Sequence, residues 1–284
     1  MARLLVIPRF VQVKESVLKG EGTADSRLKQ EIHSFDGIWK GGYYEGDPLD
    51  PMAKSTYREM GFMSVLHLTY LACIKPYINK ETVACEIGPG RGAWTKCMLE
   101  AKEIWCMDAL SPEHNGFWEY VGNAPHVQYF QVQDFSCKML PENRFNFLFS
   151  YGCLCHVSFE GITAYMTNLF SKLKPGAQCF ILVADYEKHN RAVENLDKFS
   201  IVRVLPPKLR PLGRLGLDLL YMTVRRGYKA GILPMDTDNV PTPGRWYHAG
   251  VDRTCEMLTK LSYRVIQPDM NLNYCDPVIH FTKD

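Results

Sequence analysis

Three glycines, Gly88, Gly90 and Gly92, stand between an apolar segment and a segment that favours a helix. Glycine permits tight turns and a close approach of the backbone to a ligand. The first N–H groups of a helix have no partner inside the helix and can face a bound group. Because Gly88 to Ala93 also matches a dinucleotide fingerprint, the loop alone predicts a nucleotide-like cofactor without choosing one.

Two acidic residues flank this loop. Glu86 lies in the apolar segment two residues before Gly88, where a carboxylate without partners would be costly. Asp108 lies twenty residues beyond Gly88, at the end of the next predicted strand. A carboxylate there can accept hydrogen bonds from both hydroxyls of a ribose. Asp108 therefore suits either an adenosyl cofactor or a non-phosphorylated dinucleotide.

A third acidic position follows the next predicted strand, in Gln133-Asp134-Phe135. Together with the glycine loop and Asp108, this triplet resembles the cofactor site of class I (Rossmann-like) S-adenosylmethionine-dependent methyltransferases. The resemblance implies S-adenosyl-L-methionine as cofactor and S-adenosyl-L-homocysteine as product. It further implies that Asp134 accepts a hydrogen bond from the adenine amine, with Phe135 beside the ring. Considered alone, Asp134 equally suits a turn cap, and Phe135 a core ring.

The same resemblance assigns two further positions. It implies that Glu86 supports the loop and the methionine end of the cofactor. Ser150 and Tyr151 follow the fourth strand, at the sheet edge where ligands bind in such folds, and are expected to border the methionine moiety. Packing of Tyr151 against the next helix is an equally good interpretation.

Hydrophobic periodicity predicts the elements that hold these residues. Short apolar strands alternate with helical segments, which is typical of a parallel sheet covered by helices. The last two strands are joined by too few residues for a crossover helix, so they should form an antiparallel hairpin. We therefore expect an α/β, doubly wound, mostly parallel seven-stranded sheet with a terminal antiparallel hairpin strand. The expected strands are 83–87, 104–107, 127–132, 145–150, 179–184, 263–267 and 278–282, and the expected helices are 58–77, 93–101, 112–121, 159–173 and 251–261.

Two regions lie outside this core. Residues 1–80 are expected to form an N-terminal, substrate-side extension, and residues 81–284 the methyltransferase domain, with a lid insertion at about 187–249. The resemblance covers 81–186 specifically and 250–284 more weakly. Both additions are rich in aromatic residues that could flank an acceptor. The expected substrate-binding residues are Tyr43, Tyr44, Tyr186 and His248.

His156 is the candidate catalytic base, six residues beyond the fourth strand. A neutral imidazole can accept the proton of an acceptor hydroxyl near neutral pH. A structural histidine at a helix start is the competing interpretation, and His248 and His33 are rival bases.

Residues 203–229 are strongly basic, which indicates either a solvated helix rim or contact with an anionic acceptor. We expect an O-methyltransferase for a small molecule, such as a sugar or secondary metabolite.

Composition narrows the remaining function classes. The 284 residues carry a formal net charge of +2, which provides no general field for nucleic acid or anionic membrane. Ten cysteines without a metal-binding spacing favour free thiols, and no metal is expected. The absence of a signal or spanning segment predicts a cytoplasmic protein whose partners are a small-molecule acceptor and, in an oligomer, a second copy. The alternatives are an RNA or protein methyltransferase, an NAD-dependent oxidoreductase, and a non-catalytic adenosylmethionine-binding module.

Overall fold

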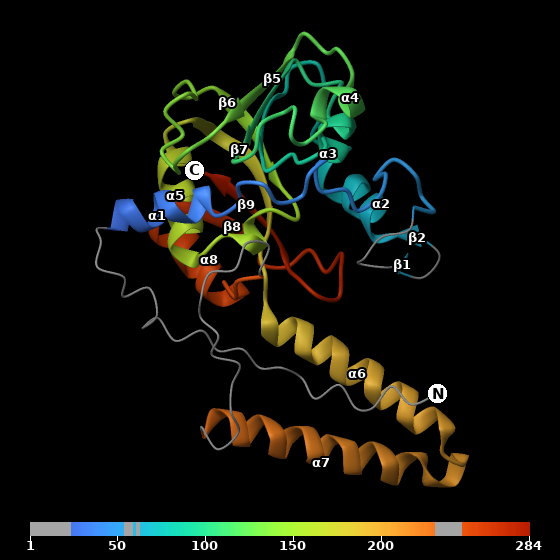
Figure 1. The fold of residues 1–284 in the computed structure, drawn as a ribbon. Coiled ribbons are helices and arrows are strands. Elements are labelled where there is room, and N and C mark those ends of the chain that lie inside the picture. Colours follow the sequence, from blue (N-terminus) through green and yellow to red (C-terminus); the bar gives the residue numbers. More distant parts are fainter. Residues whose placement is uncertain (1–23, 54–58, 61–62, 231–245) are drawn as a thin grey trace.

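The central element is a seven-stranded sheet, seen in a computed structural model that describes residues 24–53, 59–60, 63–230 and 246–284 (Figure 1). The first five of its strands along the chain run parallel to one another, whereas β9 is antiparallel to both of its neighbours. This arrangement confirms the expected fold class and the terminal hairpin. In spatial order the strands are β5 (Val127–Gln131), β4 (Glu103–Asp108), β3 (Val83–Ile87), β6 (Phe145–Ser150), β7 (Leu173–Leu182), β9 (Val278–Lys283) and β8 (Tyr263–Gln267).

Helices cover both faces of the sheet, and each face has its own apolar core. Because side chains alternate along a strand, Cys85 and Ile87 of β3 join one core while Ala84 joins the other. Every residue of β3 is buried, as expected for a central parallel strand. The first core includes residues of three helices, α1 (Ala24–His33), α5 (Phe159–Phe170) and α8 (Val251–Lys260). The second core includes residues of α2 (Val65–Thr69), the π-helix η2 (Tyr70–Ile74), α3 (Ala93–Cys97) and α4 (Phe117–Val121).

Several predicted helices are shorter than expected. The predicted helix 159–173 ends at Phe170, and β7 begins at Leu173, so Lys174-Pro175-Gly176 belongs to a strand. The pairing of β6 with β7 is irregular here: Phe145 pairs with Leu173, but Phe147 pairs with Gln178. Proline has no N–H for a regular ladder and is tolerated where pairing is interrupted.

The predicted helix 58–77 was also wrong in part. Its described portion contains a short antiparallel pair, β1 (Glu59–Met60) with β2 (Met63–Ser64), followed by α2 and then η2. The predicted helices 93–101 and 112–121 are shorter in the structure, where they are α3 (Ala93–Cys97) and α4 (Phe117–Val121). Gly116, at φ +60°, stands immediately before α4, which explains its late start.

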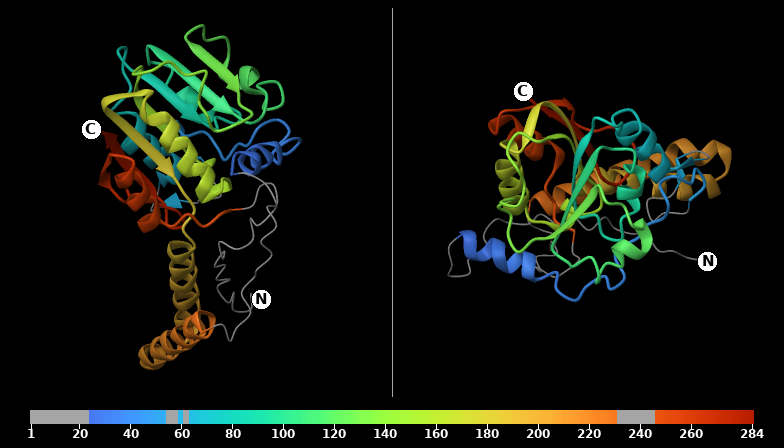
Figure 2. Two further views of the ribbon diagram at one scale, coloured as in Figure 1. Left: turned by 90° about the vertical axis from the view of Figure 1, so that its left-hand side faces the viewer. Right: turned by 90° about the horizontal axis from the view of Figure 1, so that it is seen from above.

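Two additions extend from this core. The chain after α1 crosses the sheet near the glycine loop, whereas α6 (Tyr186–Val204) and α7 (Arg210–Lys229) form a helical pair that projects away from the sheet (Figures 1 and 2). A short helix, η4 (Pro207–Leu209), joins them. None of the described helices combines the length and apolar character that a bilayer crossing requires.

Candidate active site

The glycine loop has a left-handed backbone conformation at all three of its glycines, including Gly92 at φ +98°. Gly88 and Gly90 have φ values of +69° and +52°, in the left-handed region. A Cβ atom on Gly88 would lie only 2.2 Å from Cys153 Sγ, and one on Gly90 only 3.1 Å from the carbonyl oxygen of Tyr43. The loop is therefore enclosed by the segment after β6 on one side and by the N-terminal extension on the other.

Gly92 serves packing. It precedes α3, and a Cβ atom there would lie 2.3 Å from Val121 Cγ2 of α4. Gly88 and Gly90 line the cavity beside the loop, whereas Gly92 is not among the lining residues. The three glycines expected to bind the cofactor thus divide into two at the cavity and one at a helix contact.

The cavity holds about 960 Å³ of empty space, part of it open to solvent. This volume is within the range of ordinary small-molecule sites. Its wall combines the carboxyl ends of β3, β4 and β6 with the chain after α1. The lining residues used below are Trp39, Tyr43, Glu45, Gly88, Gly90, Asp108, Phe135, Tyr151, Gly152 and His156.

Asp108 lies at the end of β4 and lines the cavity. Its Oδ2 accepts a hydrogen bond from Gly90 N at 3.1 Å, and its Oδ1 accepts one from Leu110 N at 2.9 Å. Burial raises the pKa of this carboxyl to about 6, although the backbone bonds oppose the rise. The Asp108 side chain is only partly buried and lines the cavity, so its carboxylate can also face a ribose.

Glu86 and Ser150 stabilise the loop from behind and do not line the cavity. Glu86 Oε2 accepts a hydrogen bond from Thr95 Oγ1 at 2.6 Å, and burial raises its pKa to about 7. Ser150 Oγ donates to Ile87 O at 3.0 Å, which joins β6 to β3. The contacts of Glu86 are with α3 and with Cys106 of β4, and its side chain does not line the cavity.

Of the two residues expected at the adenine, only Phe135 lines the cavity. Phe135 lines the cavity and packs edge-to-face on Tyr165, with ring centroids 4.7 Å apart. Asp134 is outside the lining, and its Oδ1 accepts a bond from Ser136 N at 2.8 Å. The turn-cap interpretation therefore describes the geometry of Asp134.

Comparison with known proteins assigns the chain to a family. The family model described as a methyltransferase domain matches residues 63–205, which is half of the chain. The chain belongs to this methyltransferase family. Its seven-stranded order, together with the glycine loop and Asp108, makes the methyltransferase a class I enzyme whose methyl donor is S-adenosylmethionine. No curated protein matches the sequence.

The chain is also similar, at low identity, to several solved methyltransferase structures. An S-adenosylmethionine-dependent methyltransferase from Methanosarcina mazei is 14% identical, with a TM-score of 0.45 and coverage of 74% of this chain and 96% of that one. Magnesium protoporphyrin IX methyltransferase from Synechocystis PCC 6803 is 13% identical, with a TM-score of 0.43 and coverage of 77% and 80%. The N-methyltransferase NodS from Bradyrhizobium japonicum is 11% identical, with a TM-score of 0.42 and coverage of 77% and 92%. The family assignment rests on the family model.

His156 of the methyltransferase lines the cavity from the short helix η3 (Leu154–His156). Its ring lies between Trp39 and Trp246, with centroids 5.1 Å and 5.9 Å away. Tyr151 lines the same cavity and packs on Trp94 at 4.8 Å. His156 and Tyr151 are therefore brought together with the glycine loop, as expected from their position after β6.

Sequence reasoning missed one carboxylate in this cavity. Glu45 lines it and accepts a hydrogen bond through Oε1 from the hydroxyl of Tyr43 at 2.9 Å. Its position within a glycine- and aromatic-rich loop was the available signal. Tyr44 instead lies outside the lining, where its ring packs against Tyr120 at 5.4 Å.

The other expected substrate residues form a pair beside the site. The rings of Tyr186 and His248 stack at 5.1 Å, and Tyr186 N donates to His248 Nδ1 at 3.1 Å. Neither residue lines the cavity. The rival base His33 is exposed at the end of α1, 3.8 Å from Asp36. Of the three histidines considered as the base, His156 is thus the one that lines the cavity.

The basic segment does not reach this cavity. Among the described residues, none of 187–230 lines it. The helices α6 and α7 extend away from the sheet (Figure 2). The exposed cations Arg210 and Arg214 lie on this projecting pair. The geometry therefore offers no support for their contact with an acceptor in the cavity, and the solvated-rim interpretation describes it better.

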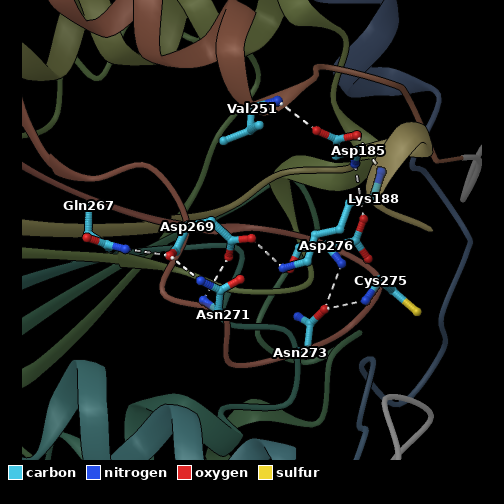
Figure 3. Close-up of polar contacts among 9 residues, drawn as sticks. All are labelled: Asp185, Lys188, Val251, Gln267, Asp269, Asn271, Asn273, Cys275 and Asp276. Atoms are coloured by element: carbon cyan, nitrogen blue, oxygen red, sulfur yellow. Dashed lines mark hydrogen bonds and ion pairs between the residues drawn. The ribbon is translucent and has the colours of Figure 1, made fainter. Parts of the chain in front are cut away.

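A partly buried polar network lies between the end of β7 and the β8–β9 connection (Figure 3). Asp276 Oδ1 accepts a bond from Asp185 N at 3.2 Å, while Lys188 Nζ is 2.6 Å from Asp269 Oδ2. Asp276 Oδ2 is buried and has no hydrogen-bond partner within the described part of the chain. Burial raises the pKa of Asp276 to about 8. In the described residues, no three His, Cys, Asp or Glu side chains are grouped to hold a metal.

We expect Asp276→Asn to make folding stability less sensitive to pH. Between about pH 4 and 8 folded Asp276 retains a proton that the unfolded chain releases, so the free energy of unfolding falls as pH rises. From pH 5 to 7 the parent should lose about 2 to 3 kcal/mol more than the variant. Urea unfolding at several pH values measures this difference. Parallel pH profiles would contradict it.

Proposed function

We propose that the methyltransferase methylates a small-molecule acceptor, on a hydroxyl oxygen of a sugar or secondary metabolite. One observation carries the proposal: a single cavity connects the glycine loop and Asp108 to His156. The cofactor supplies a sulfonium methyl group for in-line displacement. Alignment of the acceptor and exclusion of water can provide much of the rate acceleration.

Different residues of the chain bind the cofactor, exclude water and accept the proton. Asp108 accepts bonds from the ribose, and Phe135 provides an apolar surface for the adenine. Trp39, Tyr43 and Tyr151 contribute rings to the wall and reduce the access of water to the transfer point. His156 accepts the acceptor's hydroxyl proton through a ring nitrogen as the oxygen is methylated.

Cofactor binding is the first experiment. Calorimetric titration with S-adenosylhomocysteine should give saturable binding to one site, whereas NADH should give none. Incubation with methyl-labelled S-adenosylmethionine and a panel of hydroxylated sugars and phenols, with matched amines, should then transfer label to a hydroxylated compound. Label only on amines would overturn the oxygen assignment, and failure to bind S-adenosylhomocysteine would overturn the proposal as a whole.

A further inference from the structure

Glu45 holds a buried carboxylate oxygen that the chain itself does not use. Its Oε1 accepts the Tyr43 hydroxyl bond, but Oε2 is inaccessible to solvent and has no hydrogen-bond partner among the described residues. Burial raises the pKa of Glu45 to about 7. Because an unpartnered buried carboxylate is unfavourable, Glu45 is suited to a group that enters from outside the chain.

The position of Glu45 indicates which end of the cavity it serves. A Cβ atom on Gly152 would lie 3.7 Å from Glu45 Oε1, so this carboxylate is adjacent to the segment directly after β6. Tyr151, directly after β6, lines the cavity and is the residue that we expect to border the methionine part of the cofactor. Asp108 marks the ribose position at the end of β4.

Of the Asp, Glu, Lys and Arg side chains, the described cavity wall contains only acidic ones. The wall contains two carboxylates, Glu45 and Asp108, and the described residues that line it include no lysine or arginine. The rings of Trp39, Tyr43 and Tyr151 line the same space, and aromatic faces attract cations. Both features complement a positively charged ligand group.

We propose that Glu45 forms a cation subsite, in which its available carboxylate oxygen binds a positive charge on the methionine end of S-adenosylmethionine. The charge is the sulfonium or the α-ammonium group. This assignment rests on the proposed function, because it requires the cofactor to occupy the cavity. It gives the N-terminal extension a role in holding the cofactor.

Calorimetry with two probes tests the subsite. We expect Glu45→Gln to weaken S-adenosylmethionine binding about ten-fold, since the isosteric amide removes the charge but can still accept the Tyr43 bond. S-adenosylhomocysteine lacks the sulfonium but retains the α-ammonium. If its affinity is unchanged, the sulfonium is the partner; if it weakens equally, the ammonium is.

Asp47→Asn is the matched control, because Asp47 is an acidic residue of the same loop that does not line the cavity. Its affinities should equal those of the parent. Glu45→Ala should reproduce the loss seen with the glutamine variant, and thermal unfolding verifies that each variant is folded. Unchanged affinities for both probes in a folded Glu45 variant would overturn the subsite. Failure of the parent to bind either probe would instead overturn the proposed function.

Discussion

Replacing Asp108 with alanine is expected to weaken S-adenosylhomocysteine binding by about 100-fold or more. Asp108 lines the cavity and can accept charge-assisted bonds from the ribose hydroxyls, each contributing about 1.5 to 3 kcal/mol. A 100-fold loss corresponds to about 2.7 kcal/mol. Its carboxylate also accepts the N–H bond of Gly90, so the substitution removes an anchor of the loop as well. Isothermal titration calorimetry measures the change.

Asp134→Ala provides the comparison for Asp108. Asp134 caps its own turn outside the cavity lining, so its loss should change affinity by less than about three-fold. Asp108→Asn separates the two roles of Asp108, because an amide oxygen can still accept the Gly90 bond. A large loss in the Asp134 variant with little loss in the Asp108 variant would reverse our assignment of the nucleoside position.

Replacing His156 with alanine is expected to lower turnover by about 100-fold or more and to leave S-adenosylhomocysteine affinity unchanged. A positioned general base contributes about that factor, and His156 is the described candidate base that lines the cavity. Steady-state kinetics with the acceptor identified by methyl labelling measures turnover, and calorimetry measures binding. Turnover within a few-fold of the parent would remove His156 from the mechanism.

Two controls distinguish proton transfer from packing between Trp39 and Trp246. His156→Gln retains hydrogen-bonding capacity without a group that titrates near neutral pH, so it should lose turnover and the acidic limb of the pH–rate profile together. His248→Ala should retain turnover, because the His248 ring is bonded to Tyr186 N outside the cavity. A pH profile that persists unchanged in the glutamine variant would assign His156 a packing role.

The local sequence pattern was enough to predict several strands and the position of the glycine loop. Strands β3, β6 and β8 occur at the predicted residues, because apolar segments bounded by turn residues need no distant information to be recognised. The positions of Gly88, Gly90 and Asp108 followed from the same pattern. Parallel strands place their carboxyl ends at one edge, so residues that follow different strands meet there.

Contacts distant in sequence decided the remainder. Packing of α3 on α4 gave Gly92 its role, because Val121 of α4 occupies the space where a Cβ atom would stand. Glu45 became a site residue only because the chain after α1 crosses the glycine loop. The sequence by itself determined the cofactor edge, since strand ends and turn glycines are local properties. The tertiary structure alone decided which side chains face the cavity, because burial and unmet hydrogen bonds depend on segments that meet only in the folded chain.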